Sequence, residues 1–586
     1  MCGIIGFIGK NVKENLIQGL EKLEYRGYDS SGMVILHNHN FFVEKAIGPV
    51  EKLKEKVKDV EFDGIGIAHT RWATHGKITI ENCHPHFSSD NNIAIVHNGI
   101  IENFEELKLK LEKSGKYFYG QTDSEVIAKL LSKRLTINKI KRLINKIEGS
   151  YAIALISKNN NEIYFAKNKS PLYVAQGIDC SLIASDPCCF VSKCDKFYTI
   201  EDGEYGKISL NGLEVYNRNG EMIEKQAQQL NFFFKDTNKE KYSHYMIKEI
   251  NESKNVLVNL IKRYQEKDII KKLKEINIKK FNRIYLIGCG TAYHAGLVGE
   301  KYLKERFKIN VFTRKASEFF YQNDVLDEKS LCIFISQSGE TADTISAMGE
   351  TRKYKTLNVA IVNTEYSTLA SKCDLVFPIC AGQEKAVAST KAYFGQCLVL
   401  YIMASFLNGE NFIEHLLSFK KDFDFGNDNK IMQLADLLIN KNYIFFIGRG
   451  FDYITALEAS LKLKEITYIF SYSECSGELK HGTLALINQG IPVIVIANDE
   501  KCFNKTLNNA YEVKSRGGEL VLISSINIDN EIENNFEYYI KIKDCESDLK
   551  PLQTIVVLQK LAYYTAIKKG LNPDKPRNLA KSVTVE

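Results

Sequence analysis

The second residue of the chain, Cys2, combines two groups that could do chemistry once Met1 is removed. A small side chain at position 2 permits that removal, and the processed chain would then begin with a thiol and a free α-amine on one residue. The amine has an ordinary pKa of about 7.7–8.0, so it serves as a local base at neutral pH. A thiol activated in this way is a nucleophile suited to attack on an amide. The simpler alternative is a buried Cys that only begins a strand.

Four polar segments punctuated by glycine lie beside apolar stretches and provide further candidates. Such loops are where sites are commonly built. Taken singly, Arg71 also fits a solvated surface charge, and Trp72, the one Trp of the chain, also fits a core aromatic. The segments are YRGYDSSG (25–32), HTRWATHG (69–76), HNGIIENF (97–104) and TDSE (122–125).

His75, Cys83, His84 and His86 form a cluster of residue types that bind metals. The spacing C-H-P-H is not one used by zinc sites. We therefore expect no metal, and no cofactor is indicated elsewhere in the chain.

The elements that must position these residues differ between the two halves of the chain. The first 215 or so residues combine short β-prone runs with amphipathic helical stretches, which predicts sheets covered by helices. The expected strands are 1–9, 93–101, 150–157 and 161–168, and the expected helices are 103–115 and 124–135. The polar stretch FFFKDTNKEKYSH (232–244) then reads as a linker.

The second half reads as parallel α/β units, because its strands are followed by long helices. It also repeats itself: RIYLIGCGTAYHAGLVGEKYLKE (283–305) resembles YIFFIGRGFDYITALEASLKLKE (443–465). Two copies of one doubly wound domain are the economical explanation. We expect domains at 1–228, 245–425 and 426–575, with a linker at 229–244 and a tail at 576–586.

A hydroxyl-rich loop follows one strand of the first copy. LCIFIS (331–336) leads into SQSGETADT (336–344) and a helix, so hydroxyls and backbone N–H groups could bind an anion there. A capped turn would give the same pattern. VASTKAYFGQ (387–396) adds hydroxyls, whereas the second copy lacks the cradle after VIVIAN (493–498). Because only the first copy has this loop, we expect one anion-binding site per chain.

Composition excludes several classes of partner. The chain has 586 residues, a net charge of +6 and no basic tract, so nucleic acid is not indicated. The apolar run CLVLYIMASF (397–406) is about half of the roughly 20 residues that a membrane helix needs. The 14 Cys are dispersed, without a C-x-x-C pair or a secretory signal before them, which predicts reduced thiols and a cytoplasmic location.

MCGIIG and the four polar segments resemble, in order and wording, the glutaminase domain of class II (N-terminal nucleophile) amidotransferases. SQSGETADT, VASTKA, LKLKE, GELKHG and PRNLAKSVTVE resemble the sugar-isomerase (SIS) half of the glutamine–fructose-6-phosphate aminotransferase family. The chain lacks the SGGxDS loop of asparagine synthetases and a phosphoribosyltransferase loop. The resemblance implies an α/β fold, with an N-terminal nucleophile-type α/β/β/α sandwich followed by two doubly wound parallel SIS domains.

For the first half, the resemblance implies a glutamine site around Cys2. Arg71 would pair with the α-carboxylate, a task that guanidinium geometry suits, and Asp123 would take the α-ammonium. The Asn98 amide and the Gly99 N–H would form the oxyanion hole. Trp72 would gate an internal ammonia route. Thr74, His75 and Gly99 would complete the glutamine pocket.

For the second half, it implies a sugar-phosphate site. His481 would open the ring by proton transfer and would come from the neighbouring subunit of a homodimer. Lys581 would hold the sugar carbonyl as a Schiff base, and Glu465 would move a proton between C1 and C2. Lys462, three residues earlier on the same helical face, would position or balance Glu465. The phosphate would be held by Ser336, Gln337, Ser338 and Thr341, with Thr291 and Ser389 joining them or binding the sugar.

The implied reaction converts fructose 6-phosphate and glutamine to glucosamine 6-phosphate and glutamate, the first step of amino-sugar biosynthesis. The alternatives are an amidotransferase acting on another sugar phosphate, a deaminating relative, and a sugar-phosphate-sensing SIS protein without turnover. The sequence departs from the family wording at Thr483, where Pro is usual, at Lys385 and Ala386 after Glu384, and in SYSEC (471–475). These departures bear on loop geometry and affinity rather than on the reaction.

Overall fold

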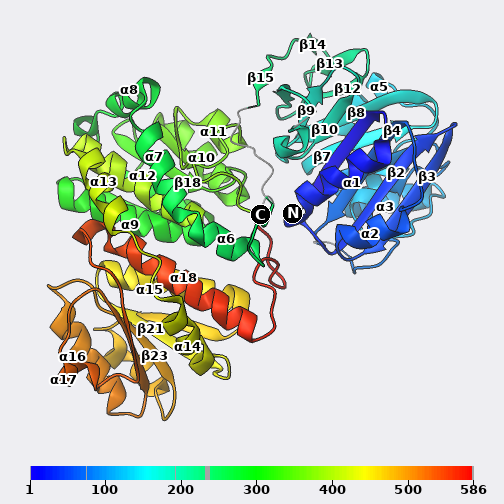
Figure 1. Ribbon diagram of the computed structural model, residues 1–586. Helices are drawn as coiled ribbons and strands as arrows, with labels where there is room; N and C mark the ends of the chain where they lie inside the picture. The colour runs from blue at the N-terminus through cyan, green and yellow to red at the C-terminus, as the bar shows by residue number, and fades with distance from the viewer. Residues whose placement is uncertain (1, 74–75, 192, 231–237, 584–586) are drawn as a thin grey trace. The chain divides into compact units, whose positions relative to one another are not determined.

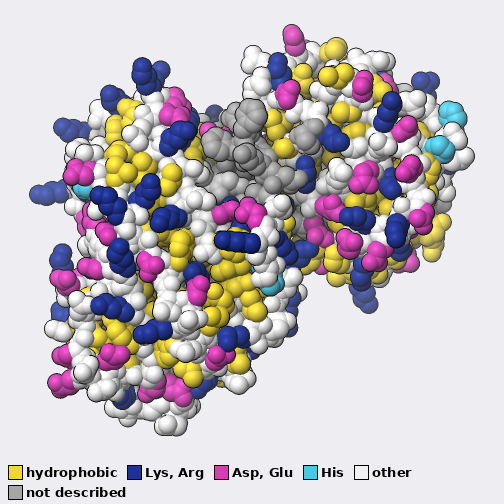
Figure 2. Space-filling model, viewed as in Figure 1, with side chains coloured by type: hydrophobic (Ala, Val, Ile, Leu, Met, Phe, Trp, Pro, Cys, Tyr) yellow, Lys and Arg dark blue, Asp and Glu magenta, His cyan; other side chains and the backbone are white. Residues whose placement is uncertain are grey.

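The computed structural model describes residues 2–73, 76–191, 193–230 and 238–583. The chain forms two compact units, residues 1–237 together with 580–586, and residues 238–579. Neither contains, within these ranges, a helix long and apolar enough to cross a membrane. On the face seen in Figure 2, positive and negative side chains are interspersed rather than gathered by sign.

The first unit is built on two antiparallel sheets. Among the described residues, the larger sheet has eight strands and the smaller has seven. The order β15-β11-β9-β10-β1-β4-β2-β3 places β1 at the centre of the larger sheet, and β6 lies near one edge of β14-β13-β12-β8-β7-β6-β5. The larger sheet contains β1 (Gly3–Gly9), β2 (Ser30–His37), β3 (Asn40–Ile47), β4 (Gly64–Arg71), β9 (Tyr173–Gln176), β10 (Ser181–Ala184), β11 (Lys196–Thr199) and β15 (Gln228–Gln229). The smaller contains β5 (His86–Phe87), β6 (Ile93–Ile101), β7 (Gly149–Ser157), β8 (Asn160–Asn168), β12 (Tyr205–Ser209), β13 (Gly212–Tyr216) and β14 (Met222–Ile223).

One core lies between the two sheets and includes Ile67 of β4 and Val96 of β6. Helices cover both outer faces, α1 (Val12–Leu23) and α2 (Val50–Lys56) on the larger sheet, and α3 (Phe104–Lys113), α4 (Ser124–Lys129) and α5 (Ile137–Ile144) beside the smaller. The layers are therefore α/β/β/α, which confirms the predicted sandwich. The helix expected over 124–135 is shorter than predicted: it ends at Lys129, and Lys133 takes a left-handed φ of 57° that no helix continues through.

The second unit contains two parallel sheets of five strands each within its described residues. The orders β17-β16-β18-β19-β20 and β22-β21-β23-β24-β25 are the same when each is counted from its own first strand. This is a doubly wound order with its switch point beside the first strand. The strands are β16 (Arg283–Gly288), β17 (Asn310–Lys315), β18 (Ser330–Ser336), β19 (Leu357–Val362), β20 (Leu375–Pro378), β21 (Tyr443–Gly448), β22 (Phe470–Cys475), β23 (Pro492–Ile496), β24 (Glu519–Ser524) and β25 (Tyr538–Lys541).

The repeat extends to backbone conformation. Gly290 and Gly450, which precede the helix that follows the first strand of each copy, have φ/ψ of 53°/−122° and 58°/−124°. Both values lie in a region that favours glycine. The fold class predicted for the second half is therefore confirmed.

Long apolar helices join the two copies into one core. In Figure 1, α18 runs alongside α15, and the two are in extensive contact. The helices of this unit are α6 (Tyr245–Asn251), α7 (Ser253–Arg263), α8 (Lys267–Glu275), α9 (Thr291–Arg306), α10 (Ala342–Thr351), α11 (Thr368–Lys372), α12 (Lys391–Leu407), α13 (Phe412–Asp422), α14 (Asp428–Leu438), α15 (Phe451–Thr467), α16 (Phe503–Lys514), α17 (Asn530–Glu533) and α18 (Lys550–Lys568).

Candidate active sites

Cys2 lies directly before β1 and next to the end of β4. The two strands pair antiparallel with Gly3 opposite Thr70, which brings Cys2 level with Arg71. The Trp72 N–H donates a hydrogen bond to Cys2 Sγ over 3.3 Å. Burial raises the pKa of the Cys2 thiol, while the Trp72 N–H and the Arg71 guanidinium lower it. The thiol therefore needs a nearby base to ionise at neutral pH.

Asn98 and Gly99 lie side by side on β6 and are brought to Cys2. Asn98 Nδ2 donates to the Cys2 carbonyl oxygen over 3.0 Å. Gly99 has a φ of 125°, and a Cβ atom built there would lie 2.1 Å from the Ser150 carbonyl oxygen. Only glycine fits this position, so the backbone at Gly99 stays open toward the pocket.

A guanidinium and a carboxylate are buried in the walls of the same pocket. The side chains of Arg71 and Asp123 belong to residues that are 5% and 4% exposed. Asp123, just before α4, is held by the Ile101 N–H, which donates to Asp123 Oδ2 over 2.8 Å. Opposite charges fixed beside a thiol suit an amino-acid zwitterion. The pocket is lined by Cys2, His69, Arg71, Trp72, His84, His97, Gly99, Thr122, Asp123 and Ser124.

Trp72 follows β4 and is half-buried, with its ring packed edge-on against Tyr28 at 5.5 Å between centroids. The Ala73 N–H donates to Asp29 Oδ2 over 2.8 Å, which fixes where this loop leaves the strand. The next two predicted pocket residues, Thr74 and His75, lie outside the described residues. The gating role of Trp72 stays a prediction.

Four buried histidines lie together, and three of them, His69, His84 and His97, line this pocket. The rings of His69 and His84 are 3.9 Å apart between centroids, and those of His84 and His86 are 4.7 Å apart. Burial lowers the pKa of His69 to about 3 and lowers the pKa values of His84, His86 and His97. Within the described residues, no group of three or more His, Cys, Asp or Glu side chains could hold a metal ion. His69 had no predicted role, although its spacing of two residues from Arg71 on one strand places both side chains on the same face of the sheet.

The hydroxyl-rich loop of the second unit lies at the topological switch point of its first sheet. Ser336 ends β18, the neighbour of β16, and its Oγ accepts the Gly339 N–H over 3.0 Å. Thr341 precedes α10, and its Oγ1 lies 3.2 Å from Ser336 Oγ. The Glu340 N–H donates to Ser338 Oγ over 3.1 Å. Loops at carboxyl ends of parallel strands beside a switch point are where such sheets bind ligands, and a helix N-terminus there favours an anion.

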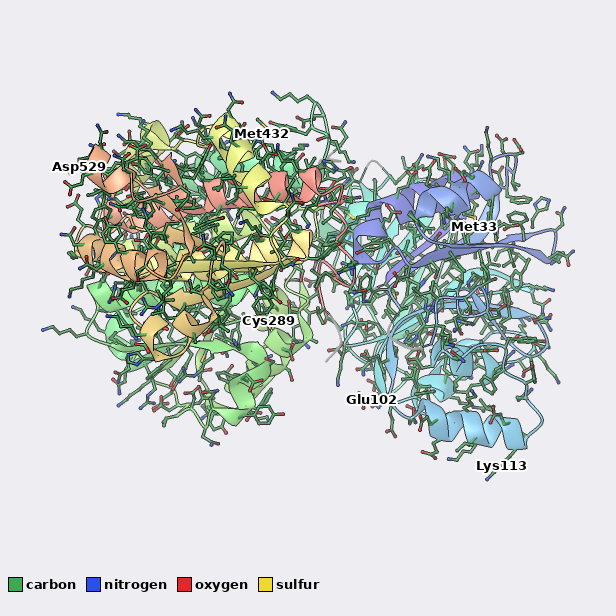
Figure 3. All side chains as sticks on the ribbon, turned by 90° about the horizontal axis from the view of Figure 1, so that it is seen from below. Met33, Glu102, Lys113, Cys289, Met432 and Asp529 are labelled. Carbon is green, nitrogen blue, oxygen red and sulfur yellow. The ribbon has the colours of Figure 1, made fainter. Side chains whose placement is uncertain are left out.

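Of the predicted phosphate residues, Ser336, Gln337, Ser338 and Thr341 share this one loop. Thr291 begins α9 after the neighbouring β16, in the turn that contains Cys289, which is labelled in Figure 3. Its hydroxyl donates to Glu458 Oε1 over 3.0 Å. Ser389 lies before α12 and donates its hydroxyl to Glu384 Oε2 over 3.0 Å. Both hydroxyls already donate to carboxylates, so in this arrangement each can only accept a hydrogen bond, from a hydroxyl group rather than from a phosphate oxygen.

Lys462 and Glu465 form an ion pair on α15, with Nζ and Oε2 2.6 Å apart. Lys462 is buried, and its ammonium also lies 3.6 Å from Oε1 of the fully buried Glu458. Glu458 also contacts α9, because its Oε2 lies 2.7 Å from His294 Nδ1. Glu458 had no predicted role, although its i,i+4 spacing to Lys462 can be read from the sequence.

His481 lies in a short 3-10 turn after β22 and is exposed. No hydrogen bond or ion pair of the described residues joins its side chain to Lys462 or Glu465. Lys581 lies in the segment that clusters with the first unit, whereas Lys462 and Glu465 belong to the second. The structure therefore brings Lys462 and Glu465 together, and the roles of His481 and Lys581 stay predictions from the family motif.

The departures from the family wording have local partners. The Thr483 hydroxyl donates to Glu474 Oε2 over 3.0 Å, a bond that proline could not make. The backbone N–H groups of Lys385 and Ala386 both donate to Glu249 Oε1. These loops are thus fixed by side chains of their own.

Comparisons with known proteins agree with this geometry. The glutamine amidotransferase domain family matches residues 69–192, and the SIS domain family matches residues 277–405 and 437–568. The glutamine–fructose-6-phosphate aminotransferase [isomerizing] of Caldanaerobacter subterraneus subsp. tengcongensis is 41% identical, and that of Fusobacterium nucleatum 38% identical, each over 100% of both chains. The C-terminal domain of glucosamine-fructose-6-phosphate aminotransferase from Francisella tularensis is a solved structure with a TM-score of 0.53 and 32% identity, covering 58% of this chain and 100% of that one.

The sandwich with a cysteine pocket and the two SIS domains define a class II glutamine amidotransferase coupled to sugar-phosphate chemistry. Full-length identity of about 40% to several relatives then fixes the family. The chain belongs to the glutamine–fructose-6-phosphate aminotransferase (isomerizing) family.

Proposed function

We propose that this chain transfers the amide nitrogen of glutamine to fructose 6-phosphate, giving glutamate and glucosamine 6-phosphate. The observation that carries the proposal is the pocket in which Cys2 and Gly99 meet the buried charges of Arg71 and Asp123, with Asn98 hydrogen-bonded to the Cys2 carbonyl oxygen. The full-length similarity to aminotransferases named for fructose 6-phosphate supports the acceptor.

In the first unit, the Cys2 thiolate attacks the side-chain amide carbon of glutamine after its proton passes to the α-amine. Arg71 pairs with the α-carboxylate and Asp123 with the α-ammonium, so the amide is directed at the thiol. Negative charge developing on the amide oxygen is met by Asn98 Nδ2 and the Gly99 N–H. Ammonia leaves, and water hydrolyses the thioester to glutamate.

The predicted pocket residues Thr74 and His75 would complete the glutamine site, and Trp72 would direct the ammonia onward. We also propose the domain limits 1–228, 245–425 and 426–575, with a linker at 229–244 and a tail at 576–586.

In the second unit, Ser336, Gln337, Ser338 and Thr341 hold the phosphate at the N-terminus of α10, with Thr291 and Ser389 beside the sugar. Lys581 forms a Schiff base with the C2 carbonyl, releasing water, and ammonia then displaces the lysine amine.

His481 opens the sugar ring before these steps, which exposes the C2 carbonyl. After amination, Glu465 removes the proton from C1 and returns it to C2, which turns the ketose skeleton into the aldose product. Lys462 holds the Glu465 carboxylate in place. The exposed His481 and the exposed edge-strand side chains Phe470 and Tyr472 support a homodimer in which His481 enters the partner's site. A cytoplasmic location fits the substrates.

The deciding experiment incubates the chain with glutamine and fructose 6-phosphate and identifies the product by mass and chromatography. We expect equal amounts of glutamate and glucosamine 6-phosphate. Parallel incubations with other ketose phosphates test the acceptor, and a product from one of them alone would replace fructose 6-phosphate in the proposal. Glutamate without any amino sugar would reject the synthase function.

A further inference from the structure

His69 connects the two sheets of the first unit at the back of the cysteine pocket. It lies on β4 of the larger sheet, is 1% exposed, and directs its ring toward β6 of the smaller sheet. Its Nε2 lies 3.0 Å from the His97 carbonyl oxygen and 3.1 Å from Asn98 Oδ1. The other end of the same carboxamide, Asn98 Nδ2, donates to the Cys2 carbonyl oxygen over 3.0 Å.

We propose that His69 is a positioning residue that fixes which end of the Asn98 carboxamide faces the nucleophile. The inference rests on the proposed glutaminase function, in which Asn98 Nδ2 is an oxyanion donor. It adds a residue of the pocket lining that acts by setting the orientation of the Asn98 carboxamide.

The two backbone carbonyls at the ends of this chain of bonds determine its direction. A carbonyl oxygen only accepts, so the His97 oxygen requires a hydrogen on His69 Nε2. That N–H then meets Asn98 and requires an acceptor there, which is the carboxamide oxygen. The Cys2 carbonyl likewise requires the NH₂ end. A rotated Asn98 would set two donors against each other at His69 and two acceptors against each other at Cys2.

The charge state of His69 agrees with this assignment. Burial lowers the pKa of His69 to about 3, so the ring is neutral and holds one hydrogen, on Nε2. Nδ1 then has only a lone pair, and it is buried without a hydrogen-bond partner in the described part of the chain. A buried unpaired acceptor costs free energy. An apolar side chain would avoid that cost, but it would also remove the His69 N–H that faces the Asn98 oxygen.

The orientation of the Asn98 carboxamide matters for catalysis. Asn98 Nδ2 stabilises the oxyanion only while its NH₂ end points to the Cys2 side of the pocket. Without His69, the carboxamide loses the partner that penalises rotation, and part of the population would present an oxygen to the developing negative charge. The chemical step would slow, while Arg71 and Asp123 would still bind glutamine.

The test measures glutamine hydrolysis by His69→Phe, which keeps a ring of similar size. We expect kcat to fall about 10–100-fold, with KM within about twofold of wild type. His69→Gln, which offers an N–H donor, should recover part of the loss. The matched control is His86→Phe, which removes another buried imidazole of the cluster but has no hydrogen bond to Asn98 in the described residues. It should keep kcat within about threefold.

A double-mutant cycle separates positioning from general damage. If His69 acts through Asn98, the His69→Phe/Asn98→Ala pair should be no slower than Asn98→Ala alone. Multiplicative losses, or an unchanged kcat in folded His69→Phe, would overturn the proposal. Should His69→Phe fail to fold, nitrogen-15 NMR of histidine-labelled wild-type protein decides, because an Nδ1–H tautomer at His69 contradicts it. If Cys2→Ala and Asn98→Ala leave hydrolysis intact, the proposed function itself fails rather than this inference.

Discussion

Glu458 Oε2 lies 2.7 Å from His294 Nδ1, so a buried carboxylate of the second SIS copy is bonded to α9 of the first copy. The same carboxylate accepts the Thr291 hydroxyl and faces the Lys462 ammonium at 3.6 Å. Sites in doubly wound sheets lie at the strand ends. Glu458 therefore ties the phosphate side of the proposed sugar site to its acid–base side.

We expect Glu458→Ala to destabilise the second unit by about 3 kcal/mol, because removing one member of a buried ionic group leaves its partners unpaired. Synthesis of glucosamine 6-phosphate should fall with it, whereas glutamine hydrolysis should persist. Urea unfolding followed by circular dichroism measures the first effect. Glu318→Gln, at an exposed position of the same unit, is the control and should change neither quantity. Unchanged stability in Glu458→Ala would mean that the ion pair with Glu465 is enough to stabilise the buried Lys462 ammonium without Glu458.

Cys2→Ala should abolish glutamine hydrolysis and all glutamine-dependent product. Glutamine should still bind, since Arg71 and Asp123 remain, and isothermal titration measures that binding directly. Borohydride trapping of fructose 6-phosphate on the variant controls for the second unit and should match wild type. Ammonia release by a folded Cys2→Ala protein would show that the nucleophile is misassigned.

The first unit should lose stability as the pH falls from about 6.5 toward 4.5. The His69 pKa is about 3 in the folded state and about 6.5 in the unfolded chain. Below pH 6.5 the unfolded chain therefore binds a proton at His69, whereas the folded protein does not. Stability is thus complete above pH 6.5 and declines as the pH drops. At pH 4.5 the loss from His69 alone is about 3 kcal/mol, and the lowered pKa values of His84, His86 and His97 act in the same direction.

Trp72 makes this measurement selective, because the one Trp of the chain lies in the first unit. Urea unfolding followed by its fluorescence at several pH values reports that unit. His69→Phe should show a shallower pH dependence than wild type. Equal slopes in the two proteins would mean that His69 is not held neutral by burial.

The sequence predicts the positions of the strands better than it predicts the tertiary contacts between them. The apolar run 93–101 became β6 with the same limits, since a buried strand is set by its own side chains. The helix expected over 124–135 stopped at Lys129, because Lys133 turns left-handed where its N–H donates to Asp90. Asn98 and Asp123 were identified from motif wording. His69 was missed because its partner Asn98 lies 29 residues away on the other sheet, and the Glu458 contact to His294 spans 164 residues and two helices, so both pairings depend on tertiary packing.

Lys581→Ala should stop synthesis while sparing glutamine hydrolysis. The Schiff base needs a lysine amine, so borohydride with fructose 6-phosphate should label wild type at Lys581 and leave the variant unlabelled. Peptide mass mapping locates the label. Lys575→Ala, six residues earlier in the chain and just before the tail, provides a control and should be labelled at Lys581 as in wild type. A label on Lys462 instead would reassign the covalent step to the buried lysine of α15.

Mixing two inactive variants tests whether His481 acts across a dimer. His481→Ala retains Glu465, and Glu465→Gln retains His481, so a mixed dimer rebuilds one complete site out of two. Equal mixing after partial denaturation and refolding should restore about a quarter of wild-type synthesis, because half of the dimers are mixed and each has one working site. Each variant refolded alone should remain inactive, which controls for the procedure. Should the mixture stay inactive while size-exclusion chromatography shows dimers, His481 would serve the chain to which it belongs.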